Sequence, residues 1–269
     1  MTAVAAPHPY ATSHALWNIE TESADGQVLA AVAKETSHRP EARPRFVHRP
    51  LREREVYRLL LDGSGAPTPR LLGVAGSFII LERLAAAPLW QTAVGEVASR
   101  AGKALRKTHD ALAGHTAAPF LLRYDASFYR RWLRRARLLD PSTAWLGDVY
   151  AAACARLLRE PLVVIHGELY PSNVLVGEQD VWFVDWESAA AGPAVIDVAA
   201  LVSGWSEPAV DALLRSYGAV DTVVLDCARL HLAVRWLGWS AGWRPPREHA
   251  RDWRAEAEQT ATRLESSLE

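Results

Sequence analysis

The fold of this chain is decided by the stretch His166 to Asn173, which reads His-Gly-Glu-Leu-Tyr-Pro-Ser-Asn and is followed twelve residues later by Asp185. A short apolar run, 162–165, precedes the stretch, and a second one, 181–184, precedes Asp185. Apolar runs of this length, each ending in polar residues, are typical of buried strands. The sequence therefore predicts two neighbouring strands, each followed by a loop that carries polar side chains.

These loop residues are of the types that phosphoryl transfer needs. That reaction requires a cation on the phosphates, metal ligands, and a carboxylate near the attacking hydroxyl. Asn173 and Asp185 offer hard oxygen ligands suited to Mg²⁺. We expect Glu168 to accept the proton of the hydroxyl and His166 to brace the loop through hydrogen bonds. Asp197, a polar residue within the apolar run 195–200, is expected to anchor the catalytic loop.

The cation is predicted to come from the N-terminal part of the chain. Of the 30 basic residues only three are lysines, and Lys34 is the only one in the first hundred residues. Leu16 to Lys34 has the alternation of a β-hairpin, with Lys34 at the end of its second strand. The segment 51–61 reads as a short helix that carries Glu53 and Glu55. We expect Glu53 to hold Lys34 by an ion pair, with Glu55 as the alternative.

The character of the chain changes between residues 82 and 90. Before this point the hairpin, the short helix and two strands, 68–74 and 77–81, form a small β-rich lobe. A proline-rich loop, 40–50, separates the hairpin from the helix. Beyond this point helical spacing dominates, in 91–112, 127–139, 147–158, 194–203, 210–217 and 226–268, the last interrupted by Pro245-Pro246. We predict an α+β protein with an N-terminal lobe of residues 1–84 and a larger helical lobe of residues 85–269.

Three motifs together carry a family resemblance: His-Gly-Glu-Leu-x-x-x-Asn at 166–173, Val-Asp-Trp-Glu at 184–187 and Ile-Asp-Val-Ala at 196–199. In this pattern the chain resembles the aminoglycoside phosphotransferase and choline kinase group, whose fold is protein-kinase-like. The resemblance spans residues 16–240 in order and is specific between 162 and 200. One position departs from it, because Glu168 stands where the catalytic loop of kinases has an Asp.

The resemblance implies a nucleotide and a small-molecule partner. It implies an ATP-type donor, Mg²⁺ ions and an acceptor with a hydroxyl group. It also implies that adenine lies against the backbone around Glu82 to Leu84, and that the phosphate loop falls at 21–26, although no glycine-rich signature is visible there.

Composition excludes several other classes of protein. The net charge of -1 gives no bulk attraction to nucleic acid or to an anionic membrane. No stretch reaches the roughly 18 apolar residues of a spanning helix, and 1–10 has no leader pattern, so a cytoplasmic protein is expected. Cys154 and Cys227 are far apart in the sequence, and we expect both to be ordinary packing residues in a reducing compartment.

Two features bear on the acceptor. Between 123 and 137 the chain carries six arginines against the single acidic residue Asp125, and their field opposes a polycation. A neutral or anionic acceptor is therefore expected in preference to an aminoglycoside, although most of these arginines should form a solvated helix face. Trp236, Trp239 and Trp243 share a helical face, with Trp253 beyond them. They form either core packing or an aromatic wall for a ring or a quaternary ammonium.

The sequence thus predicts an ATP-dependent kinase that acts on the hydroxyl of a metabolite or antibiotic. Two alternatives remain at this point: a nucleotide-binding protein with impaired catalysis, and an enzyme that transfers a nucleotidyl group. The choice between the kinase and the impaired protein turns on Glu168. Its side chain is one methylene longer than that of Asp and can misplace the carboxylate by about 1 Å, which is enough to slow a reaction on the order of 100-fold.

Overall fold

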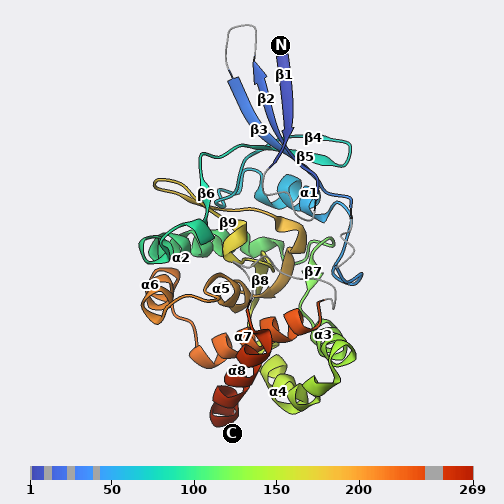
Figure 1. The fold of residues 1–269 in the computed structure, drawn as a ribbon, viewed down its shortest axis with the longest axis vertical. Coiled ribbons are helices and arrows are strands. Elements are labelled where there is room, and N and C mark those ends of the chain that lie inside the picture. Colours follow the sequence, from blue (N-terminus) through green and yellow to red (C-terminus); the bar gives the residue numbers. More distant parts are fainter. Residues whose placement is uncertain (1, 9–13, 23–27, 39–42, 240–250, 269) are drawn as a thin grey trace.

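The computed structural model describes residues 2–8, 14–22, 28–38, 43–239 and 251–268. A small antiparallel sheet stands at one end of an elongated molecule, and helices make up most of the rest (Figure 1). The protein is therefore of the α+β class, with a β-rich N-terminal region and a mainly helical remainder, as predicted.

The N-terminal sheet has the strand order β1-β2-β3-β5-β4, with every neighbouring pair antiparallel. Its strands are β1 (Thr2–Pro7), β2 (Leu16–Glu22), β3 (Val28–Glu35), β4 (Leu71–Ala75) and β5 (Phe78–Glu82). The predicted hairpin is present, with Leu16 opposite Lys34. On its other side Lys34 lies opposite Ile79 of β5. Strand β1, which the sequence reasoning did not foresee, pairs with the outer edge of β2.

The helix predicted at 51–61 begins one residue later and changes its winding. Leu51 adopts a left-handed backbone conformation, with φ at 62°, directly before α1 (Arg52–Val56). The chain then continues as a single π-helical turn, η1 (Tyr57–Leu61). Helix α1 lies beneath the sheet, on the side of the helical region (Figure 1).

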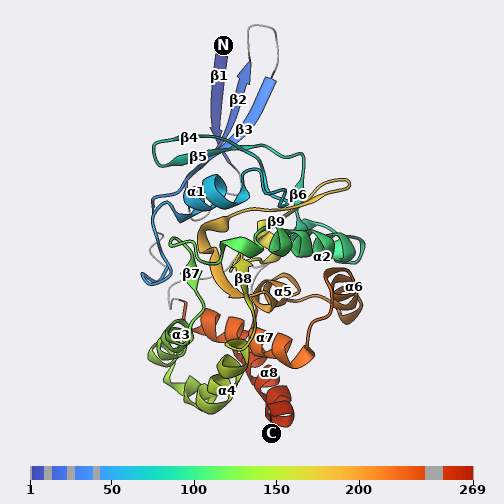
Figure 2. The same cartoon turned by 180° about the vertical axis from the view of Figure 1, so that it is seen from behind.

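The longer helices form the other end of the molecule. They are α2 (Val94–Ala111), α3 (Ala126–Leu139), α4 (Gly147–Leu157), α5 (Val195–Leu201), α6 (Glu207–Tyr217), α7 (Thr222–Leu237) and α8 (Trp253–Leu268). Side chains cap three of them, since Asp125 accepts from Phe128 N at 2.7 Å, Asp221 from Val223 N at 2.8 Å and Asp252 from Ala255 N at 2.9 Å. Figure 2 shows α2 lying across the molecule between the sheet and the remaining helices. Helix α7 packs against α3, α4, α5 and α8 and so forms the centre of this end.

Two three-stranded sheets complete the fold, in the orders β10-β9-β6 and β7-β11-β8. Their strands are β6 (Ala87–Pro88), β7 (Leu122–Arg123), β8 (Leu162–Ile165), β9 (Val174–Val176), β10 (Val181–Phe183) and β11 (Ala190–Pro193). The apolar runs at 162–165 and 181–184 do form strands, but the prediction that they are neighbours was wrong. Each pairs with a strand of weaker signal, β8 with β11 and β10 with β9.

The composition of β11, Ala-Ala-Gly-Pro, explains why it escaped prediction. All four residues are buried, and a Cβ at Gly192 would lie 2.7 Å from the side chain of Ile165. The strand is selected by close approach to β8, which a propensity scale does not register.

Among the described residues no helix is long and apolar enough to cross a membrane.

Candidate active site

The loop after β8 is held by one buried carboxylate. Asp197, in the first turn of α5, accepts hydrogen bonds from the backbone N–H of His166 at 2.7 Å and of Gly167 at 2.9 Å. Its Oδ2 also lies 3.2 Å from Nε2 of His109, whose other ring nitrogen is 2.9 Å from the hydroxyl of Tyr217. Asp197 has 0% exposure, so its polar oxygens need these hydrogen-bond partners in place of water. The carboxylate fixes the first two residues of the loop.

Glycine is required at the second loop position. Gly167 has φ at +79°, and a Cβ there would lie 2.5 Å from the carbonyl oxygen of Ser188. The close approach brings the loop after β8 against the loop after β10, although their strands belong to different sheets. His166 joins the same two loops, since its Nε2 lies 2.8 Å from the carbonyl oxygen of Val184. This is the bracing contact expected of His166.

Asn173 lies beside the acidic loop. Its side-chain Nδ2 donates to the carbonyl oxygen of Glu168 at 2.8 Å, which directs the amide nitrogen back into the loop. The backbone carbonyl oxygen of Asn173 accepts from Val184 N at 3.0 Å. The residue after Val184 is Asp185, which has a left-handed backbone with φ at 69° and ψ at 59°. A non-glycine residue in that conformation is uncommon, and such residues often mark functional sites.

Lys34 connects the N-terminal sheet to this loop. Its Nζ lies 2.6 Å from Oε2 of Glu53 and 2.7 Å from Oδ1 of Asp185. Burial opposes the charged ammonium, but the nearby carboxylates outweigh burial, and the pKa of Lys34 is raised above its ordinary value. The lysine therefore remains a cation at neutral pH. Glu55, the alternative partner, lies 3.5 Å from Arg49 instead.

Glu168 carries two ion pairs. Its Oε1 pairs with Nη2 of Arg235, on α7, and its Oε2 lies 3.3 Å from Nη2 of Arg43. Arg43 also pairs with Glu187, whose second oxygen lies 2.7 Å from Nε2 of His14. Burial opposes ionisation of Glu187, but the Arg43 guanidinium and the other cations nearby hold its pKa well below the usual range. The result is a chain of alternating charges at the rim of the loop.

Helix α1 is fastened to the helical region by its first turn. The guanidinium of Arg52 donates to the carbonyl oxygens of Phe120 at 2.9 Å and of Val47 and Glu187 at 2.8 Å each. Glu53 Oε1 accepts from the backbone N–H of Trp186 at 3.1 Å. Glu53 thus contacts both Lys34 and the loop that follows β10.

Tryptophan rings pack against the two arginines that pair with Glu168. Trp239 stacks on Trp132 of α3, with centroids 5.8 Å apart and planes 8° apart. The guanidinium of Arg235 lies 5.4 Å from the Trp239 centroid and that of Arg43 lies 5.7 Å from it. The aromatic cluster is therefore partly core packing, and its faces are turned to cations of the protein itself. Trp243 lies outside the described residues.

Trp236 and Trp253 continue this cluster toward α8. Their ring centroids are 5.6 Å apart with planes 19° apart, and the Trp236 indole N–H donates to the hydroxyl of Tyr170 at 2.6 Å. Most of the arginines counted between 123 and 137 are exposed on α3, as a solvated helix face requires. Arg135 instead donates to the carbonyl oxygens of Gly238 and Trp239 and so closes the end of α7.

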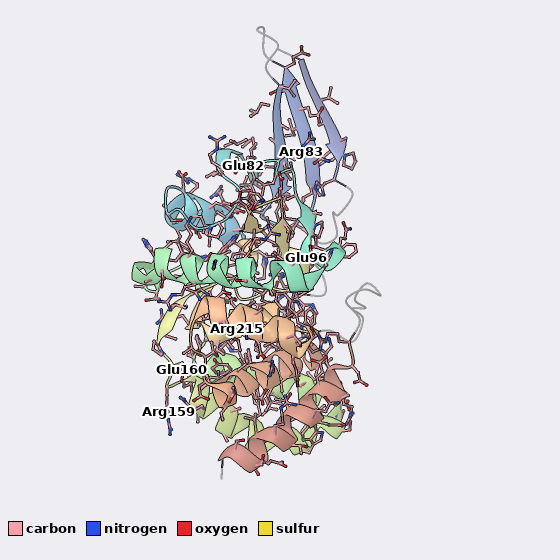
Figure 3. The ribbon with its side chains drawn as sticks, turned by 90° about the vertical axis from the view of Figure 1, so that its left-hand side faces the viewer. Glu82, Arg83, Glu96, Arg159, Glu160 and Arg215 are labelled. Atoms are coloured by element: carbon pink, nitrogen blue, oxygen red, sulfur yellow. The ribbon has the colours of Figure 1, made fainter. Side chains whose placement is uncertain are left out.

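The region expected to receive adenine lies where β5 ends. Glu82 is the last residue of that strand, and its carboxylate accepts from Arg70 N at 2.9 Å. Arg83 N donates to Ala30 O at 3.2 Å, so the connection stays joined to the sheet as far as this residue. Figure 3 shows Glu82 and Arg83 together at the base of the sheet. Leu84 follows and is half-buried. Of the expected phosphate loop, 23–26 fall outside the described residues.

Four side chains around the loop were not predicted from the sequence: His14, Arg43, Glu187 and Arg235. Glu187 lies in the motif Val-Asp-Trp-Glu and could have been assigned from its place after Asp185. Arg43 belongs to the proline-rich loop, where charged residues carry no periodic signal. Arg235 lies next to Trp236, in a helical stretch where an arginine gives no sign of its tertiary partner.

The oxygen donors present suit a magnesium ion. Among the described residues no group of three or more His, Cys, Asp and Glu side chains could hold a metal by itself. Mg²⁺ commonly binds through one or two protein groups together with substrate phosphates and water, so a full cage is not needed. Asn173 and Asp185 offer such a partial set, and the Asp185 side chain remains 32% exposed beside Lys34.

A buried lysine on a small sheet, placed over an acidic loop and a His-Gly-Glu loop of a helical region, defines the protein-kinase-like class of fold. The chain belongs to the phosphotransferase enzyme family, whose sequence profile matches residues 38–237. No curated protein sequence is significantly similar to it.

Solved structures agree with this assignment. A choline/ethanolamine kinase family protein from Mesorhizobium loti is 17% identical with a TM-score of 0.63, over 99% of this chain and 88% of that one. The macrolide 2'-phosphotransferase MphH from Brachybacterium faecium is 18% identical with a TM-score of 0.64, over 98% and 92%. The aminoglycoside phosphotransferase APH(3'')-Id from Streptomyces rimosus, in complex with ADP and streptomycin, is 18% identical with a TM-score of 0.58, over 88% and 93%. At these identities the likeness shows the fold, and the predicted family resemblance is confirmed.

Proposed function

We propose that the protein is a small-molecule kinase, which transfers the γ-phosphate of ATP to a hydroxyl group of a metabolite or antibiotic. The observation that carries the proposal is the contact of Lys34 with both Glu53 and Asp185, at 2.6 and 2.7 Å. These residues come from the sheet, from α1 and from the loop after β10. A buried cation between a helix carboxylate and a loop carboxylate is the arrangement that kinases use to position phosphates.

Each residue then has a role in the transfer. Lys34 neutralises the phosphates of the donor, and Asn173 and Asp185 would hold Mg²⁺, which offsets charge on those phosphates. The connection from Glu82 to Leu84 would border the adenine. The acceptor oxygen forms a bond to the γ-phosphorus while the bond between that phosphorus and the β-γ bridging oxygen breaks, and ADP leaves. Glu168 receives the hydroxyl proton.

Glu168 can serve as the base because phosphoryl transfer makes modest demands on the position of the base. The transition state of phosphoryl transfer is loose in most analyses, so positioning and charge matter more than proton abstraction. Asp197 and Asn173 secure the loop on both sides of Glu168, at 2.7 to 2.9 Å. A longer carboxylate on a well-fixed loop can still reach a hydroxyl.

A second candidate is a nucleotide-binding protein without turnover. It is favoured by one observation, namely that both carboxylate oxygens of Glu168 already pair with Arg235 and Arg43.

The buried arginines also bear on the acceptor. Two guanidiniums beside Glu168 favour a neutral or anionic acceptor over a polycation.

Mass spectrometry of the products separates these functions. The protein is incubated with ATP, Mg²⁺ and a panel of hydroxylated metabolites and antibiotics of each charge class. Gain of one phosphate by an acceptor supports the kinase, gain of a nucleotide supports a nucleotidyl transferase, and magnesium-dependent ATP binding without product supports the second candidate.

Variants test the residue roles in the same assay. Asp185→Ala is expected to abolish transfer, whereas Glu168→Asp should keep a measurable fraction of it. Asp110→Ala, on the exposed face of α2, is the matched control and should transfer at the rate of the wild type. Full activity of Asp185→Ala would refute its assignment as a metal ligand.

A further inference from the structure

We infer that the acceptor is an anionic hydroxyl compound, and that its carboxylate or phosphate group takes the place of Glu168 on Arg235, which releases Glu168 to act as the base. The inference rests on the proposed kinase function and specifies its substrate class. It starts from the ion pairs of Glu168 and from the burial of their arginine partners.

As it stands, the carboxylate of Glu168 is engaged at both ends. Oε1 pairs with Arg235 and Oε2 lies 3.3 Å from Arg43, while the side chain is 13% exposed. A general base has to offer a lone pair within hydrogen-bond reach of the proton that it accepts. Two guanidiniums compete for those lone pairs. At least one ion pair must open before transfer.

Opening the pair leaves Arg235 without a counterion. Arg235 is 2% exposed, and its guanidinium lies over Trp132 and Trp239, with centroids at 5.7 and 5.4 Å. Within the described part of the chain, Glu168 is its one carboxylate partner. A buried cation that loses its only counterion is strongly destabilised. A replacement anion is therefore needed, and the acceptor is the molecule that arrives when Glu168 must be free.

Arg235 also has an unused donor for such an anion. Its Nε–H is buried and has no hydrogen-bond acceptor among the described residues. Nε and Nη2 form one edge of the guanidinium fork, which matches two oxygens of a carboxylate or phosphate. Glu168 occupies only Nη2 of this edge. A ligand anion could use both donors, which gives it an advantage over the internal carboxylate.

Arg43 is placed to stay where it is during the exchange. It keeps its pair with Glu187, which His14 holds from the other side at 2.7 Å. The exchange thus concerns mainly Arg235, and the second arginine supports the negative charge from a fixed position. A cationic acceptor would meet the same two guanidiniums and be repelled.

Sulfate binding measured by isothermal titration calorimetry tests the exchange directly, without nucleotide and without turnover. Sulfate is a dianion that has no hydroxyl to phosphorylate. In the wild type it has to compete with Glu168. Glu168→Gln removes this competitor and should tighten binding by about tenfold, within the range of couplings between linked sites. Arg235→Gln should abolish the binding in both backgrounds.

Two further variants keep the test decisive. The double variant Glu168→Gln/Arg235→Gln removes both charges together, so it avoids an uncompensated buried carboxylate if Arg235→Gln alone does not fold. Arg235→Lys retains the charge but lacks the fork, and it should bind sulfate more weakly than the wild type. Circular dichroism establishes folding before each titration.

The exchange is overturned if sulfate binds equally well to the wild type and to Glu168→Gln, or if binding persists in folded Arg235→Gln or in the double variant. It is also overturned if the product assay shows that cationic or neutral acceptors are phosphorylated in preference to anionic ones. Failure of the kinase proposal looks different, because no acceptor in the panel would gain a phosphate while Arg235-dependent sulfate binding was still measured.

Discussion

Replacing Asp197 should destabilise the protein more than the loss of an ordinary carboxylate. Asp197 is fully buried and accepts from His166 N at 2.7 Å, from Gly167 N at 2.9 Å and from His109 at 3.2 Å. In Asp197→Ala two backbone N–H groups lose their acceptor, and an unsatisfied buried donor destabilises a fold by about 1–3 kcal/mol. The broken contact with His109 adds to this, while removal of a buried charge offsets a part.

The sum for Asp197→Ala is a loss of about 3–5 kcal/mol in the free energy of unfolding, out of the roughly 5–15 kcal/mol typical of a protein. Asp197→Asn keeps one acceptor oxygen and should lose about 1–3 kcal/mol. Urea unfolding followed by circular dichroism measures both. Hydrogen exchange should also accelerate at the amides of residues 166 and 167, because these are the donors that lose their acceptor.

The control for this experiment is Asp110→Ala. Asp110 forms an exposed pair with Arg106 at 2.8 Å on one face of α2. Water and salt screen an exposed pair of this kind, so it contributes little to stability. If Asp197→Ala unfolded within about 1 kcal/mol of the wild type, like this control, the carboxylate would not be the anchor of the loop and the reasoning would be refuted.

Three other changes can be measured on the same material. Although burial lowers the pKa of His14, its hydrogen bond and charge attraction to Glu187 raise it above 6.5, so this stabilisation is complete below the unfolded pKa and is lost as pH rises through the folded one. The difference in unfolding free energy between the wild type and His14→Gln should thus be larger near about pH 6 than near about pH 9, and equal differences would contradict the pairing. Gly167→Ala should lower the unfolding free energy by about 1–3 kcal/mol or more, because its φ is +79° and the added Cβ would meet a carbonyl oxygen; a neutral effect in thermal unfolding would disprove this. Burial raises the pKa of Cys154 to about 12 and of Cys227 to about 11, so a thiol reagent near pH 8 should label them only after unfolding, and rapid labelling of the native protein would speak against their burial.

Much of the fold could be predicted from local signals in the sequence. Patterns of a few residues predict the hairpin that ends at Lys34, the helix that carries Glu53 and the loops with Asn173 and Asp185. The rarity of lysine singled out Lys34, and the structure places it beside Asp185, which is 151 positions away in the chain. The neighbouring-strand prediction failed because β11 is made of small residues whose close packing leaves no pattern.

The partners of Glu168 could not be predicted for a different reason. Arg235 is 67 positions from it and Arg43 is 125 positions from it, and nothing in either local sequence points to the loop. Such pairs depend on the tertiary arrangement of α7 and of the proline-rich segment. Sequence reasoning therefore found the residues that local motifs mark and missed those whose partners depend on tertiary contacts.

The attachment of α1 sets limits on how the two ends of the molecule can move. Arg52 binds the carbonyl oxygens of Phe120 and Glu187, and Glu53 binds the backbone of Trp186, so the first turn of α1 belongs mechanically to the helical end. If the two ends move apart to admit a nucleotide, the sheet should tilt over a stationary α1, and the contact between Lys34 and Glu53 would be the one that breaks and re-forms.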